Sequence, residues 1–167
     1  MVKGDLTWYY AFLHLSVNGK IIGDPLESCS VLTWLNSVSL FLNRIKNNEL
    51  ANDEFSNRKD DELFELIWKA NQFKDEFNPA YTYLPQLDSA VWENCHLSLD
   101  ETTDAYLITT TQIDDDIKII WQGWRNPCTP NLINKLFSLS IRKETLIKIL
   151  EDCHTYVMAD LANYRIK

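Results

Sequence analysis

Apolar and polar positions over the first 25 residues predict a β-hairpin. Aromatic and β-branched residues dominate from Leu6 to Val17, and this composition is typical of a strand. Asn18-Gly19 follows, and the central residues of a type I′ turn need positive φ, which asparagine and glycine adopt most easily. Residues 20–22 form the predicted returning strand, which ends before Pro25.

Two segments with helical spacing of apolar residues come next. Between Ser28 and Lys46, large apolar residues recur at steps of three and four, which predicts an amphipathic helix. Residues 47–59 are polar and rich in asparagine, so we expect an exposed connection. A second helix is predicted to begin near Asp60, because acidic residues in a first turn interact favourably with the positive end of the helix dipole.

The remainder of the chain predicts antiparallel strands followed by a long helix. Asp114-Asp115-Asp116 lies between two segments of strand-like composition and suits a tight turn. The predicted strands cover residues 91–99, 105–113, 117–124 and 136–141, and the C-terminal helix covers about 143–163.

We therefore predict a single α+β domain over residues 1–167. Its antiparallel sheet begins with the N-terminal hairpin, and the two central helices and the long C-terminal helix pack on one face of the sheet. Apolar residues make up 46% of the chain and aromatic residues 12%, which suffices for a sizeable core and excludes a disordered acidic protein. Only four glycines occur, and none has the spacing of a phosphate-binding loop.

Charge is unevenly distributed along the chain. The formal net charge is −8, and residues 53–116 contain 16 acidic residues against four basic ones. This acidic region repels nucleic-acid phosphates, so we expect no direct binding of DNA or RNA. It attracts a basic protein surface and accelerates their encounter; the plainer alternative is that the excess charge only keeps the protein soluble.

Cysteines and histidines form no recognisable catalytic or metal-binding motif. The four cysteines include no C-x-x-C pair, so we expect no structural zinc, no other metal and no cofactor. An enzymatic alternative is a dyad assembled in space from Cys95 and His154. The first residues lack a signal-peptide pattern, and no stretch approaches the ~20 apolar residues of a membrane span. We therefore expect a cytoplasmic protein with reduced thiols and no membrane association.

The candidate partner-binding residues are acidic residues in predicted turns and aromatic residues in predicted loops. Aromatic residues are common anchors of protein interfaces. Alternation along the strand directs Trp121 towards the core and Trp124, together with Ile120, towards solvent. The plainer interpretation of each acidic group is a solvated turn. The candidates are Asp100, Glu101, Asp104, Asp114, Asp115 and Asp116, with Tyr81, Tyr83 and Trp124 as aromatic anchors.

Two stretches of the sequence resemble a known group of bacterial proteins. The aromatic first strand followed by Val17 to Asp24 resembles a pattern in polymorphic-toxin immunity proteins, including those of contact-dependent growth inhibition systems. Ile117 to Trp121, followed by a loop, a strand and a C-terminal helix, is also similar. The resemblance implies a cytoplasmic protein without catalytic residues that binds and blocks one toxin domain, often a nuclease.

Under that resemblance, the acidic residues occlude the toxin's basic substrate cleft by replacing nucleic-acid phosphates, and an RNase is favoured over a DNase. Two other functions stay open: a small cytoplasmic enzyme with a dispersed site of Cys, His and acids, and an adaptor subunit of a larger complex. A pocket that brings Cys95 or Cys153 within reach of a histidine would favour the enzyme. A broad exposed apolar patch would favour the adaptor.

Overall fold

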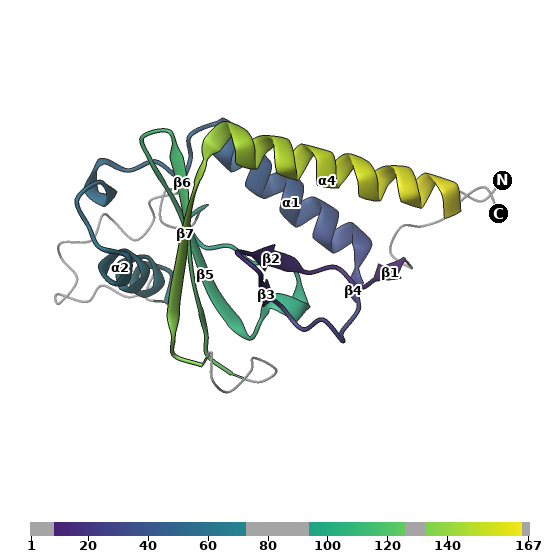
Figure 1. The fold of residues 1–167 in the computed structure, drawn as a ribbon, viewed down its shortest axis with the longest axis horizontal. Helices are drawn as coiled ribbons and strands as arrows, with labels where there is room; N and C mark the ends of the chain where they lie inside the picture. The colour runs from purple at the N-terminus through teal and green to yellow at the C-terminus, as the bar shows by residue number, and fades with distance from the viewer. Residues whose placement is uncertain (1–8, 73–93, 126–132, 165–167) are drawn as a thin grey trace.

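The computed structural model describes residues 9–72, 94–125 and 133–164 (Figure 1). Helices and antiparallel strands are combined in it, so the α+β class is confirmed. In chain order the elements are β1 (Tyr10–Ala11), β2 (Leu15–Val17), β3 (Lys20–Ile22), β4 (Cys29–Ser30), α1 (Val31–Lys46), the 3₁₀ turn η2 (Asp53–Phe55), α2 (Asp60–Gln72), the 3₁₀ turn η4 (Glu101–Thr103), β5 (Tyr106–Ile113), β6 (Asp116–Gly123), β7 (Leu136–Arg142) and α4 (Lys143–Tyr164).

The main sheet is antiparallel, with β6 between β5 and β7. Ile113 pairs with Asp116 around a two-residue turn, so β5 and β6 form a hairpin over their whole length. On the other side of β6, the register pairs Asp116 with Arg142, the last residue of β7. β7 then continues directly into α4.

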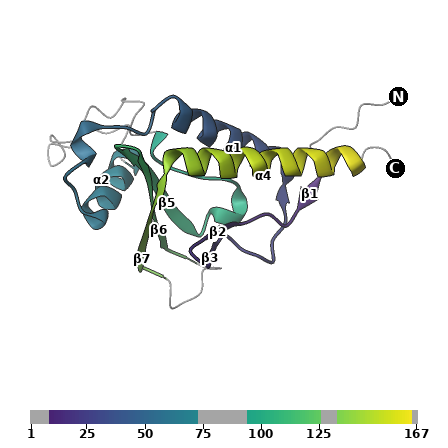
Figure 2. The same ribbon diagram turned by 45° about the horizontal axis from the view of Figure 1, so that its top comes forward.

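Helices cover both faces of this sheet, which corrects the prediction that all of them pack on one face. α1 and α4 lie together on one side and α2 lies on the other (Figures 1 and 2). Ile119 and Trp121 of β6 belong to the larger core with α1 and α4, whereas Ile120 is fully buried in a smaller core with α2. Successive strand residues point to opposite faces, so one strand serves both cores. Of the two residues predicted to face solvent, Trp124 is 45% exposed and Ile120 is buried.

The N-terminal hairpin is confirmed, but it forms a two-stranded sheet of its own instead of the start of the main sheet, and its first strand is shorter than predicted. β2 pairs with β3, and Asn18 and Gly19 between them take φ of 48° and 72°. Upstream, β1 pairs with β4 instead, so the segment predicted as one strand changes partner between Ala11 and Leu15. The strand predicted over 91–99 is likewise reduced, within the described residues 94–99, to one isolated bridge between His96 and Thr109.

The helix starts follow local chemistry. Ser30 caps α1 by accepting a hydrogen bond from the Thr33 amide. The predicted start of α2 at Asp60 is confirmed, and this carboxylate reaches back to the sheet, where Lys118 Nζ lies 2.6 Å from Oδ1 and the Ser138 hydroxyl donates to Oδ2. These two donors hold the pKa of Asp60 below its ordinary value.

Gly23 joins the end of β3 to the loop before β5. Its φ is +121°, and a Cβ at this position would lie 3.2 Å from the Thr102 hydroxyl oxygen. The next amide, of Asp24, donates to the Thr102 carbonyl at 3.0 Å. A side chain is disfavoured here by the backbone conformation, and its Cβ would also press on the Thr102 hydroxyl.

Candidate functional site

The turn between β5 and β6 presents aspartates at one end of the sheet (Figure 1). Asp114 is exposed and takes a left-handed conformation with φ 53°, which aspartate tolerates better than most residues. The side chain of Asp115 is 89% exposed and that of Asp116 is 45% exposed. The predicted tight turn is confirmed; Asp114 and Asp115 are open to solvent, whereas Asp116 is partly covered and its Oδ1 is buried.

Arg142 lies beside these aspartates and was missed by sequence reasoning. Its guanidinium nitrogens lie 3.4 Å from Asp116 Oδ1 and 3.8 Å from Asp115 Oδ2. The groups are largely exposed, and such ion pairs contribute only about 0–1 kcal/mol. Asp114 forms no ion pair with any residue that the structure describes. In the sequence, Arg142 is a basic residue directly after the strand predicted over 136–141. Only the strand register shows that it lies beside the turn.

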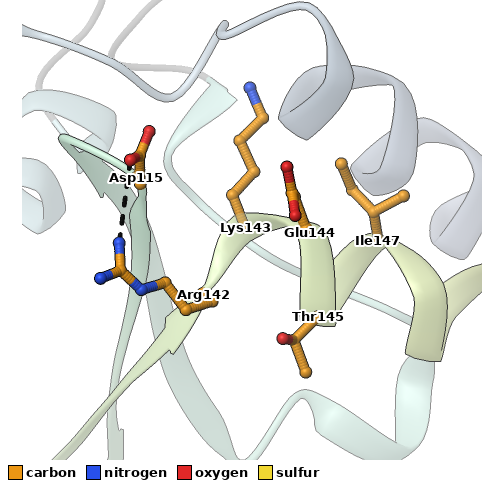
Figure 3. Close-up of a pocket in the computed structure, with 6 residues that line it drawn as sticks. All are labelled: Asp115, Arg142, Lys143, Glu144, Thr145 and Ile147. Atoms are coloured by element: carbon orange, nitrogen blue, oxygen red, sulfur yellow. Dashed lines mark ion pairs between the residues drawn. The ribbon is translucent and has the colours of Figure 1, made fainter.

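A pocket of about 680 Å³ opens next to the turn, where β7 passes into α4 (Figure 3). The backbone joins its two sides, because the Lys143 amide donates to the Asp115 carbonyl at 2.9 Å. Lys143 and Glu144 extend in the same direction from the start of α4, and Thr145 points the opposite way (Figure 3). The Lys143 ammonium group donates to the Asn48 side chain. The site therefore combines exposed carboxylates with two cations that neighbouring residues already engage.

Asp100 belongs to the interior rather than to the surface. It is 6% exposed, and its Oδ1 accepts hydrogen bonds from the Thr102 amide at 2.7 Å and the Thr102 hydroxyl at 2.5 Å. Burial, followed by the effect of this neighbouring carboxylate, raises the pKa of Cys29 to about 12. Asp100 thus caps η4, and we leave it out of the candidate surface. Glu101, next in the chain, is exposed.

Asp104 and Trp124 lie side by side at the other end of the β5–β6 hairpin. The Trp124 indole N–H donates to the Asp104 carbonyl at 2.8 Å. The neighbouring Arg125 lies over the Trp124 ring, 4.5 Å from its centroid, and 3.8 Å from Asp104 Oδ2. Here too, an acidic candidate is paired with an arginine of the same chain.

The predicted acidic residues therefore form two groups rather than one. β5 has eight residues and separates Asp104 from Asp114, and at about 3.3 Å per residue the two groups lie roughly 25 Å apart. One flat partner surface would contact both groups only if it extended along the whole hairpin. Tyr81 and Tyr83 lie outside the described residues.

The enzymatic alternative rests on thiols whose surroundings disfavour reactivity. Cys95 is buried under α2, on the face of the sheet opposite the helix that carries His154, and burial raises its pKa to about 12. A separate pocket of about 210 Å³ does have both His14 and Cys153 in its lining, which is otherwise almost entirely apolar. Burial raises the pKa of Cys153, which disfavours the nucleophilic thiolate. No three metal-ligating side chains gather within the described ranges.

Exposed apolar side chains occur far from the aspartate turn. Tyr10 and Phe12 near β1 and Tyr156 on α4 are each more than half exposed. Tyr10 and Tyr156 line a pocket of about 330 Å³ between β1 and the C-terminal half of α4. This is the surface on which the adaptor interpretation would depend.

None of the helices that the structure describes is long and apolar enough to cross a membrane. No curated protein and no solved structure matches the chain. A family model described as immunity protein 42 matches residues 2–156, which include the aspartate turn, its Arg142 and the Trp124 region. The chain therefore belongs to the immunity protein 42 family and is a protein that binds a cognate toxin.

Proposed function

We propose that this immunity protein neutralises a nuclease toxin by covering its basic substrate cleft with the tip surface, defined as Asp114, Asp115, Asp116 and the adjoining pocket. The family match supports the binding of a toxin. The proposal that the tip surface covers the substrate cleft rests on one observation. Asp114 and Asp115 are exposed at the end of a continuously paired hairpin.

Electrostatics favour a basic partner at this surface. A cleft that holds RNA or DNA must be lined by cations, and carboxylates can take the positions of the phosphates. The net charge of −8 accelerates the approach of such a protein. Charge pairs that become close and desolvated at an interface couple by about 1.5–7 kcal/mol, whereas charges at the rim mainly alter the association rate.

The start of α2 extends the acidic surface towards the turn. The ion pair between Asp60 and Lys118 places the first turn of α2 beside β6, and Lys118 lies two residues from the start of that strand. Asp61 and Glu62 in this first turn are exposed. Their charge adds to the local negative potential without being part of the contact that we propose.

The first experiment is affinity purification of the tagged chain from its native bacterium at moderate salt. We expect one basic protein with nuclease activity, an RNase rather than a DNase, that the chain inhibits stoichiometrically. A partner without nuclease activity would contradict the substrate class, and partners that bind through the apolar surface near Tyr10 and Tyr156 would favour the adaptor function.

The second experiment locates the contact. The double change Asp114→Asn and Asp115→Asn keeps the shape of the side chains and the turn, because asparagine also tolerates positive φ. Its matched control is Asp152→Asn with Asp160→Asn, which removes the same charge from exposed positions on α4. We expect the tip variant to weaken toxin binding and to reduce its salt dependence much more than the control does. Equal effects of the two variants would exclude the tip surface as the contact.

We also propose that the chain acts by binding alone, in the cytoplasm, against a toxin delivered by contact between cells. The raised thiol pKa values of Cys95 and Cys153 support binding over catalysis, since neither thiol is poised to act as a nucleophile. The sequence resemblance is the support for delivery by contact. Protection of a strain that expresses the chain, challenged by living neighbours and separately by their cell-free medium, tests this route.

A further inference from the structure

A pocket of about 230 Å³ lies at the end of the β5–β6 hairpin opposite the aspartate turn. Its lining contains several aromatic rings together with one carboxylate and one guanidinium. We call it the Trp124 pocket, and its lining includes Trp68, His96, Asp104, Trp124 and Arg125.

The indole of Trp124 is fixed in place while much of its ring stays accessible. Its N–H donates to the Asp104 carbonyl at 2.8 Å, and its backbone amide donates to the Ala105 carbonyl at 3.0 Å. The residue is 45% exposed. A ring that is already positioned loses little conformational freedom when a partner docks on it.

The position of Arg125 reveals which chemistry this pocket accommodates. Its guanidinium lies 4.5 Å from the centroid of the Trp124 ring and 3.8 Å from Asp104 Oδ2. A ring face and a carboxylate are the two groups that recognise a guanidinium. The ion-pair distance is long and the Arg125 side chain is 51% exposed, so the interaction is weak and a competing cation can displace it.

The His96 ring in the lining of the pocket adds no positive charge of its own. The His96 ring lies 6.1 Å from that of Trp68, centroid to centroid. Burial, and then the nearby Arg44, lower the pKa of His96 below its ordinary value. The imidazole is therefore neutral near physiological pH and offers a ring without repelling a cation.

We infer that the Trp124 pocket binds an arginine side chain of a protein partner, and that Arg125 occupies this site in the free protein. A basic toxin supplies such a side chain, so the identity of the partner rests on the proposed function. The pocket lies roughly 25 Å from the tip surface along β5. It would give the complex a second anchor that contains a tryptophan, a residue type enriched in interface hot spots.

N-acetyl-L-arginine amide is the probe that tests the site without any toxin. Titration is followed by two-dimensional NMR of the nitrogen-labelled protein, in which each tryptophan indole N–H has its own signal and Trp124→Phe assigns the relevant one. We expect a saturable shift of the Trp124 signal, and none with N-acetyl-citrulline amide, which has the same shape without the charge.

Two variants separate a binding site from a structural cluster. Arg125→Gln should strengthen probe binding by about threefold or more, because removing an internal competitor raises the fraction of protein able to bind. Asp104→Asn should weaken it, and Lys148→Gln at an exposed position of α4 serves as the matched charge control, with no effect. The inference is overturned if Arg125→Gln gives no gain, or if citrulline amide shifts the signal equally. Since the probe is a single amino acid, failure of toxin binding at the tip surface would leave this result unchanged.

Discussion

Two adjacent isoleucines of β6 provide a direct test of the two-sided sheet. Ile119 is 4% exposed in the core under α1 and α4, and Ile120 is fully buried in the core under α2. Neighbouring strand residues face opposite sides, so in a sheet covered on one face only one of the two would be buried. With both faces covered, we expect Ile119→Ala and Ile120→Ala each to be strongly destabilising.

The magnitude follows from the burial of the two side chains. Isoleucine has three carbons more than alanine, and at about 0.8 kcal/mol for each buried methylene their loss costs about 2.4 kcal/mol. The cavity left behind adds to this, so each change should lower the free energy of unfolding by about 3–4 kcal/mol. For a domain of this size each kcal/mol lowers Tm by about 2–4 °C, which predicts a decrease of about 6–16 °C.

Urea unfolding followed by far-ultraviolet circular dichroism measures these losses. The matched control is Ile21→Ala in β3, because Ile21 is 40% exposed and such a truncation should cost less than about 1 kcal/mol. A small cost for Ile120→Ala beside a large cost for Ile119→Ala would show that α2 does not cover the sheet. The position of the acidic first turn of α2 near the tip surface would then be wrong as well.

Three further predictions concern backbone conformation, pH and thiol chemistry. Gly23→Ala should lower Tm more than Gly19→Ala, since both residues have positive φ but only at Gly23 would a Cβ make a tight contact, with the Thr102 hydroxyl; equal losses would contradict the steric argument. Asp60→Asn should destabilise the protein at neutral pH. Because the pKa of Asp60 is lowered in the folded state, the difference should begin to shrink as pH falls below about 4, the unfolded pKa, and should vanish only below the still lower folded pKa. Urea unfolding at both pH values tests this, and a difference that persists in acid would contradict it. In the native protein, iodoacetamide should modify exposed Cys153 far faster than buried Cys95, as read by peptide mass spectrometry; similar rates would contradict the burial of Cys95.

The elements predicted correctly are those specified by short-range interactions. Asn18-Gly19 forms a hairpin turn because its two residues adopt positive φ at low cost. α2 begins at Asp60 because an acidic first turn stabilises a helix start wherever the helix packs. The turn after Ile113 forms for the same kind of reason, since aspartate tolerates the left-handed conformation.

Predictions that depended on the choice of strand partner were less accurate. The segment from Leu6 to Val17 has strand composition, but composition carries no information about which strand pairs with it, and within its described part β1 and β2 pair with different partners. The segment predicted over 91–99 supplies one bridge to β5 within its described part. Strand propensity measures how well a residue fits a sheet. It does not show whether a segment joins a particular sheet.

The sequence alone determined the α+β class, the hairpin turns, the helix starts and an acidic central region, because each depends on residues close together in the chain. Tertiary structure alone decided where the charges lie. It buried Asp100, set Arg142 opposite Asp116, and separated Asp104 from the aspartate turn by the length of β5. The strand register and the face of the sheet to which a side chain points depend on contacts between segments distant in the chain. An apolar run such as the one around Ile120 is equally compatible with a sheet covered on one face and with a sheet covered on both.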